Sequence, residues 1–191
     1  MTRRFARLFL FLAASVAAFG VSVAGQSPIG SFPPPPASLE ELWNRSDVVA
    51  HVRVESTKLR SARTSRPQSA TAIREHTLQV IELFKGTLPK GRALTVSQEG
   101  GVVVAEGREV VTKYQEKLLD AGSEEILFLH EWPSESTYTT TSGPPGVFRL
   151  TPDRKDVEVP ESMRRQALFS AAKKVPLQAF VERLRSLKGG K

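Results

Sequence analysis

Apolar and polar residues alternate along several short runs in the middle of the chain, a pattern typical of half-buried strands. In the first run, residues 48–54, the even-numbered positions are all valine or alanine and face one side. The odd-numbered positions, Val49, His51 and Arg53, face the other. A second, longer run spans residues 72–84. Further strands are expected between turn residues at 93–97, 102–105, 137–141, 147–150 and 157–159.

Residues 125–132 form the most apolar of these runs. Ile126, Leu127, Phe128 and Leu129 follow one another, so both faces of this strand are apolar. A short run that is apolar on both faces is typical of a strand buried on both sides. We therefore expect this strand at the centre of the sheet. The preceding residues, 108–123, show no clear period.

Two regions have helical rather than strand patterns. Ser38 and Glu41 form a capping box, which predicts a short helix ending near Arg45. After Pro160 the period becomes helical, and we expect one helix over 161–174 and another from Pro176, whose apolar side carries Leu177, Phe180, Val181, Leu184 and Leu187. We expect these helices to pack on the β domain. A partner-binding or membrane-surface role for the last helix is the alternative.

Together these elements predict a mainly β fold with a short N-terminal helix and a helical C-terminal tail. The preferred architecture is a small antiparallel Greek-key (OB-like) barrel over residues 38–160, with the helices of 161–191 packed on it. A two-sheet sandwich is the competing architecture. Residues 26–37, which include four consecutive prolines, are expected to form a stiff linker.

The first 25 residues have the layout of a secretory signal peptide. Arg3, Arg4 and Arg7 precede an apolar stretch over 8–24, and small residues follow. We expect cleavage next to Ala24 or Gly25, which leaves about 166 residues, enough for one domain. Retention as a membrane anchor is the alternative, although the stretch is shorter than the roughly 20 residues that span a bilayer.

The charge and the cysteine content of the chain limit its expected cellular location and chemistry. The chain carries a formal charge of +7, of which three charges belong to the leader arginines, so +4 remains after cleavage. There is no cysteine, which excludes a thiol nucleophile, a thiolate metal site and disulfide bonds. A cysteine-free exported protein is more typical of a bacterial envelope than of an animal extracellular space. We therefore predict a secreted or periplasmic protein.

The order of segments resembles a group of uncharacterised exported bacterial proteins. Their fold looks like the oligonucleotide/oligosaccharide-binding (OB) barrel of tissue inhibitors of metalloproteinases and netrin-like modules. The segments that carry the resemblance are 39–42, 46–54, 80–86, Gly100–Gly101, Gly122 with 126–129, and 143–148.

This resemblance implies an architecture and no functional residue. Inhibitors of that fold chelate the zinc of their target through a disulfide-anchored N-terminal cysteine. Here the mature chain would begin at Gly25 or Gln26, and no cysteine exists. The inhibitory mechanism therefore does not carry over to this sequence.

No catalytic or metal-binding motif is present in the sequence. His51, His76 and His130 fall on expected strands without metal-ligand spacing, and we interpret them as separate surface or boundary residues. The acidic pairs Glu40–Glu41 and Glu124–Glu125 are interpreted as solvated ends of elements. The glycine pairs lack the phosphate-binding pattern and are interpreted as turns. We therefore predict neither an enzyme nor a bound cofactor or metal.

A polar segment at 56–70, interpreted as a loop, is the best candidate for binding. Lys58, Arg60, Arg63 and Arg66 lie within nine residues there, and guanidinium groups suit phosphate and sulfate. Nucleic acid is not expected, because no aromatic residue for base stacking lies between Val54 and Phe84. The loop instead suggests an anionic glycan or lipopolysaccharide, with a flexible solvated loop as the alternative.

The sequence thus predicts an exported, non-catalytic binding protein of the bacterial envelope. Its partner is expected to be an envelope protein or an anionic glycan, and membrane contact is expected only through the leader if that segment is kept. One alternative is an inhibitor of an exported hydrolase that wedges a barrel loop into the cleft of its target. The other is a polyanion binder that uses the basic segment.

Overall fold

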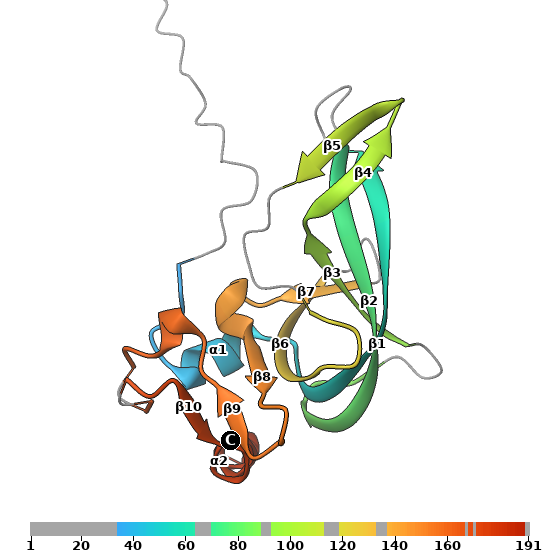
Figure 1. The fold of residues 1–191 in the computed structure, drawn as a ribbon. Coiled ribbons are helices and arrows are strands. Elements are labelled where there is room, and N and C mark those ends of the chain that lie inside the picture. Colours follow the sequence, from blue (N-terminus) through green and yellow to red (C-terminus); the bar gives the residue numbers. More distant parts are fainter. Residues whose placement is uncertain are drawn as a thin grey trace, which may run out of the picture. The chain divides into compact units, whose positions relative to one another are not determined.

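The computed structural model describes residues 34–63, 70–88, 93–112, 119–132, 137–166, 168–169 and 171–189. The expected leader, its cleavage site at Ala24 and Gly25, and most of the linker lie outside these residues. The described residues belong to one compact unit that runs from Phe32 to Lys191. The unit is mainly β, as expected (Figure 1). Its elements are α1 (Leu39–Arg45), β1 (Val48–Arg63), β2 (Ala70–Lys85), β3 (Leu94–Glu99), β4 (Gly101–Ala105), β5 (Arg108–Thr112), β6 (Glu124–Trp132), β7 (Thr137–Thr140), the 3-10 turn η1 (Pro144–Gly146), β8 (Val147–Leu150), β9 (Asp156–Glu158), the 3-10 turn η2 (Glu161–Met163), β10 (Lys174–Pro176) and α2 (Leu177–Gly189).

Backbone pairing organises these strands into one large sheet and one hairpin. In the large sheet, β1, β2, β3, β7 and β6 pair in that order, and β6 pairs again with β1. These pairings are antiparallel except for that of β3 with β7, which joins Val96 and Tyr138 in parallel. Strands β8, β9 and β10 continue the sheet from β6, while β4 and β5 form a separate two-stranded hairpin.

The apolar core consists of two clusters on opposite faces of β1 and β6. Ile126 and Phe128 contribute to one cluster, whereas Leu127 and Leu129 contribute to the other. Strand β6 pairs with β1, β7 and β8, so its expected central position is confirmed. The expected alternation in β1 is confirmed as well, because Val49 faces the first cluster and its even-numbered neighbours face the second.

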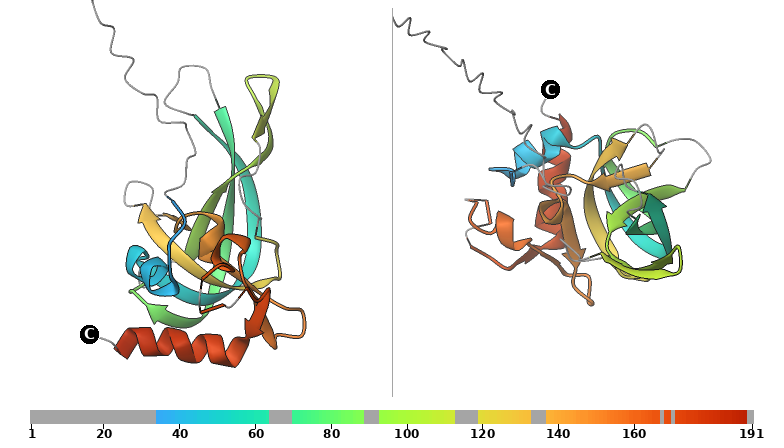
Figure 2. Two further views of the ribbon diagram at one scale, coloured as in Figure 1. Left: turned by 90° about the vertical axis from the view of Figure 1, so that its left-hand side faces the viewer. Right: turned by 90° about the horizontal axis from the view of Figure 1, so that it is seen from above.

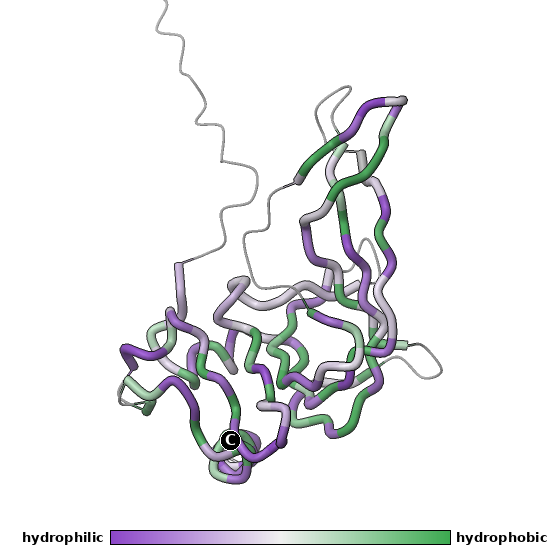
Figure 3. The backbone as a smooth tube through the Cα atoms, in the orientation of Figure 1, coloured by the Kyte–Doolittle hydropathy of each residue, from purple (hydrophilic) through white to green (hydrophobic). Residues whose placement is uncertain are grey.

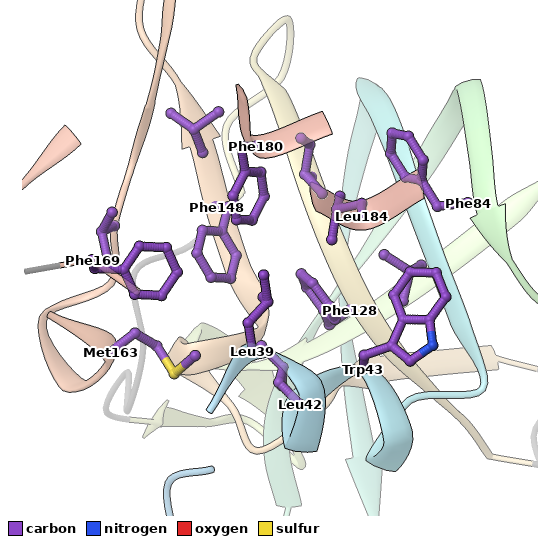
Figure 4. Packing of buried hydrophobic residues seen from close by; sticks show 14 of the residues in the cluster. Leu39, Leu42, Trp43, Phe84, Phe128, Phe148, Met163, Phe169, Phe180 and Leu184 are labelled. Atoms are coloured by element: carbon purple, nitrogen blue, oxygen red, sulfur yellow. The ribbon is translucent and has the colours of Figure 1, made fainter. Parts of the chain in front are cut away.

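The first cluster joins both helices to the sheet. Figure 4 shows the side chains of α1 and α2 converging with phenylalanines from the strands. Phe148 is the centre of this aromatic group, with its ring centroid 4.8 Å from that of Phe180 and 5.5 Å from that of Phe128. Offset aromatic contacts at such distances add to the stabilisation from burial alone. The helices therefore belong to the same folding unit as the sheet.

The N-terminal helix forms as its capping box predicts. The Ser38 hydroxyl accepts a hydrogen bond from the backbone N–H of Glu41 at 3.0 Å. The Glu41 carboxylate reaches back to the N–H of Ala37 and also pairs with Arg45 one turn later. The pKa of Glu41 is lowered, mainly by the hydrogen bond from Ala37. These contacts fix both ends of a helix that has only seven residues.

The expected helix over 161–174 is wrong. Among the described residues of this range only η2 is helical, and β10 follows it and pairs with β9. The buried side chains are Met163 and Phe169, six residues apart, which is not a helical spacing. Ala171 has a positive φ of 64°, which ends any helix. The burial of Met163 and Phe169 and the pairing of β10 with β9 thus override the helical tendency of this segment.

The final helix, α2, confirms the second half of the expected tail. It buries Phe180 and Leu184 against the first cluster and leaves its charged residues outside. In the side view of Figure 2 this helix lies at the end of the unit opposite the β4–β5 hairpin. Among the described residues, no helix has the length and apolar content needed to cross a membrane.

Candidate functional site

Residues 56–63 of the basic segment form a strand, so the interpretation as a loop is wrong for that part, whereas residues 64–69 lie outside the described residues. Lys58, Arg60 and Arg63 lie on β1, which continues to Arg63, and Arg66 lies outside the described residues. This half of β1 has no apolar period because it extends beyond the core, where neither face is fully buried. The Arg60 Nε donates to the Glu75 Oε1 at 2.6 Å, and Lys58 is the residue directly opposite Glu75 in β2. One carboxylate therefore offsets part of this positive charge.

The three histidines do not come together. His130 contacts Asp47, with 2.7 Å between the Nδ1 and Oδ2 atoms, and His51 lies 3.4 Å from Glu124. His76 corrects the expectation of a surface or boundary position, because its exposed fraction is 0%. No group of three or more metal-ligand side chains occurs in the part of the chain that the structure describes.

Glu124 and Glu125 also correct the sequence interpretation, because both carboxylates are buried rather than solvated. They are adjacent on β6 and so point to opposite faces of the strand. The Glu125 Oε1 accepts hydrogen bonds from Arg149 Nε at 2.8 Å and from Ser123 Oγ at 2.9 Å. Two carboxylates on opposite faces do not form the pair across one cleft that glycoside hydrolysis needs.

Arginines neutralise Glu124 in the same way. Its Oε1 accepts from Arg53 Nη2 at 2.6 Å and lies 2.9 Å from Arg154 Nη2. Burial opposes ionisation of this carboxyl, but the hydrogen bond from Arg53 and the charge of Arg154 outweigh it and lower the pKa of Glu124. A carboxylate held in its charged form by two guanidinium groups is a structural ion pair rather than a proton donor near neutral pH.

The β4–β5 hairpin carries the feature that sequence reasoning missed. Gly100 and Gly101 have positive φ angles of 142° and 130°, and here the chain leaves the edge of β2. A Cβ on Gly101 would lie 2.9 Å from the Leu59 side chain, so the hairpin begins in close contact with β1. At the other end of the hairpin, Thr112 Oγ1 accepts from the Ala72 N–H at 2.8 Å. Both ends of the hairpin are thereby fixed to the long strands β1 and β2.

The two faces of this hairpin differ. Val103 and Val110 are paired and half-buried, whereas Val102, Val104 and Val111 expose 48%, 73% and 63% of their surface. Val102 is directly opposite Val111, and Val104 is directly opposite Glu109. The three exposed valines therefore share one face, which we call the valine face, with Glu109 beside Val104. Figure 3 shows hydrophobic stretches in both strands of the hairpin with a hydrophilic turn between them.

The valine face stands out within the described part of the chain. Seven large apolar side chains are exposed in that part of the chain, and three of them belong to this one hairpin. Strands β4 and β5 pair only with each other in that part of the chain, so each has an unpaired backbone edge. Strand β4 itself, Gly-Val-Val-Val-Ala, has no charge and no proline to protect that edge. The only signal in the sequence was the run of three valines, which predicts a strand but not its exposure.

Comparisons with known proteins do not assign this chain to a family. A scan against protein-family models finds no matching family, and a search of curated proteins finds no similar sequence.

Proposed function

We propose that this chain is an exported, non-catalytic binding protein of the bacterial envelope that engages a partner protein through the valine face. The observation that carries the proposal is the shared exposure of Val102, Val104 and Val111 on a hairpin whose base is fixed. Isolated exposed apolar residues are normal, but contiguous apolar patches mark interaction sites. The partner therefore needs an apolar surface of its own.

The unpaired edge of β4 strengthens this proposal. Because β4 pairs only with β5 among the described residues, the N–H and C=O groups of its other edge could pair with an extended segment of the partner, which would add a strand to the hairpin. Such pairing supplies affinity through the backbone, while the valine side chains supply selectivity for apolar residues. Natural proteins usually protect apolar edges with charges or proline, so an unprotected edge is best explained by a partner that covers it.

Export is the second part of the proposal and rests on the sequence. The arginines and apolar stretch of residues 1–25 support a leader. The lack of cysteine means that the mature domain needs no oxidation to fold, and the two apolar clusters offer an alternative source of stability. We propose a secreted or periplasmic location on these grounds.

The scaffold in this proposal is a closed Greek-key barrel with OB-like topology. Support comes from the pairings through β1, β2, β3, β7 and β6, which return to β1. The OB fold is likewise a five-stranded barrel. A two-sheet sandwich would leave free edges on both sheets, whereas a ring of pairings leaves none. In this arrangement the hairpin is an insertion in the chain between β3 and β6.

The test uses the mature chain, residues 26–191, immobilised and exposed to an envelope extract from the native organism. We expect a captured protein that is lost with Val104→Lys, because a charge at the most exposed valine has to be buried at the interface. Ile81→Lys places the same charge on another exposed apolar residue, outside the hairpin, and should leave capture intact.

Hydrogen exchange on the purified complex provides the second readout. Amides of residues 101–112 should become protected when the partner binds, while the rest of the unit changes little. Equal capture by wild type and Val104→Lys, or protection that appears only elsewhere, would contradict binding through the valine face.

Inhibition of an exported hydrolase is the second candidate, and the same hairpin favours it. A narrow two-stranded projection with an apolar face is a suitable shape for entering an enzyme cleft. A panel of exported proteases and glycosidases separates the two roles. An inhibitor lowers one rate at stoichiometric concentration and loses this effect with Val104→Lys, whereas a plain binding protein lowers none.

A further inference from the structure

A groove lies at the end of the unit opposite the hairpin, between α1, the last residues of β2, and α2. Its volume is about 830 Å³, which falls within the usual range of ligand pockets. Apolar residues from all three elements line it, namely Trp43, Leu83, Phe84 and Leu187. The polar lining residues are Glu40, Asn44, Lys85, Arg183, Ser186 and Lys188.

The wall between α1 and β2 is held rigidly. The Lys85 Nζ donates to the backbone carbonyls of Trp43 and Ser46, each at 2.7 Å, and lies 5.7 Å from the centre of the Trp43 ring. Gly86 has a φ of 85°, and a Cβ there would lie 2.3 Å from the Asp47 carbonyl oxygen. The wall of the groove between α1 and β2 is therefore a formed feature of the fold.

The charges around the groove do not balance. Three cations and one carboxylate line it, and Arg183 pairs with that carboxylate, Glu40. Lys85 is occupied by the two carbonyls. Lys188 is exposed in the last turn of α2 and forms no ion pair with any residue that the structure describes. An anion bound at this end of the groove would neutralise the charge of Lys188.

We propose that this groove binds an amphipathic anion, a molecule with one acyl chain and an acidic head group. The acyl chain would lie against Trp43, Leu83 and Leu187, and the head group would contact Lys188 with Arg183 beside it. The charge complementarity of the cationic rim and the apolar lining together select such a ligand. A neutral amphiphile leaves the rim unpaired, and an inorganic anion leaves the apolar wall exposed. This site is separate from the valine face and does not depend on the partner proposed there.

Trp43 supplies a direct reporter of binding. The chain has two tryptophans, and Trp132, which is 51% exposed on β6, can be replaced by phenylalanine so that only Trp43 emits. The mature Trp132→Phe protein is titrated with dodecyl phosphate below its micelle concentration. We expect a saturable change in Trp43 fluorescence. Dodecyl maltoside, which has the same chain and a neutral head, should bind about tenfold more weakly, and inorganic phosphate should produce no change.

Two matched variants test the role of the rim. Lys188→Gln removes the unpaired charge and should weaken dodecyl phosphate binding about tenfold. Lys173→Gln removes the same charge from an exposed position that does not line the groove and should leave binding unchanged. Both positions are exposed, and denaturant unfolding confirms that each variant is folded.

Three results would overturn the proposal. Equal affinity for the phosphate and maltoside amphiphiles would indicate an apolar surface without head-group recognition. Equal weakening by Lys188→Gln and Lys173→Gln would indicate a diffuse effect of net charge. A fluorescence change with inorganic phosphate that matches the one with dodecyl phosphate would indicate an anion site that does not use the apolar wall.

Discussion

His76 illustrates how a single buried residue shapes the behaviour of this protein. Its Nδ1 lies 2.9 Å from the Thr57 hydroxyl oxygen. Burial lowers the pKa of His76 to about 4, and the positive charge of Arg74 acts in the same direction. The histidine is therefore neutral in the folded protein at neutral pH.

This pKa predicts a loss of stability in mild acid. Because the unfolded chain takes up a proton near pH 6.5 and the folded chain only near 4, stability is full above pH 6.5 and falls between these values. Between pH 7 and pH 5, His76 alone should lower the free energy of unfolding by about 2 kcal/mol. Urea unfolding of wild type and His76→Gln at both pH values measures this. The variant should lose about that much less, and an identical loss in both proteins would contradict the argument.

The same residue shows what a sequence cannot reveal. His76 lies two residues before Leu78, so the two share one side of the strand, which fits an inward position. Histidine is nevertheless common at surfaces, and the burial of His76 results from the neighbouring strands β1 and β3. Glu125 is similar, since its burial depends on Arg149, a partner 24 residues away. Burial of polar residues depends on distant partners, which a local pattern does not contain.

At the scale of elements, α2 shows the opposite case, in which a local pattern is sufficient. Its apolar residues recur at helical spacing, and Phe180 and Leu184 are buried as that spacing predicts. By contrast, the length of β1 was underestimated, because residues 55–63 leave the core and lose their apolar period. Strand β5 was missed in a segment without a clear pattern, since it pairs only with β4 in the described chain.

The packing of α2 leads to a paired prediction. Leu184 is fully buried in the first cluster, while its neighbour Arg185 is exposed and pairs with Glu82 at 2.8 Å. Leu184→Ala should lower the free energy of unfolding by about 2–5 kcal/mol because it leaves a cavity. Arg185→Ala should change it by less than about 1 kcal/mol, since exposed ion pairs contribute little. Denaturant unfolding compares the two, and similar losses would mean that α2 does not pack as described.

At the scale of the whole molecule, the mainly β class and the two helical ends could be predicted, because each depends on local periods. The valine face could not, since the exposure of Val102 and Val104 depends on where the hairpin lies in the fold. The groove could not either, because it joins residues of α1, β2 and α2 that are far apart in sequence. The secondary-structure elements could therefore be predicted from local sequence, whereas the candidate sites depend on the tertiary arrangement of those elements.

The unequal cover of the strands predicts an order of local stability. Strand β6 has paired neighbours on both edges and buried side chains on both faces, whereas β4 and β5 are covered on one face only. Amide hydrogen exchange should therefore be slowest over 126–129 and fastest, among the described strands, over 101–112. Mass spectrometry of peptides from these two segments measures the difference. Equal protection would mean that a further contact covers the hairpin in the free protein.

Strands β1 and β2 have one further consequence. The same two strands line the core at one end and contact both ends of the β4–β5 hairpin at the other. Since both ends of the hairpin are held, docking of the proposed partner would cost less conformational entropy than the ordering of a free loop. Because the three valines of the valine face belong to neither apolar cluster, substitutions there should alter binding of the proposed partner with little effect on stability.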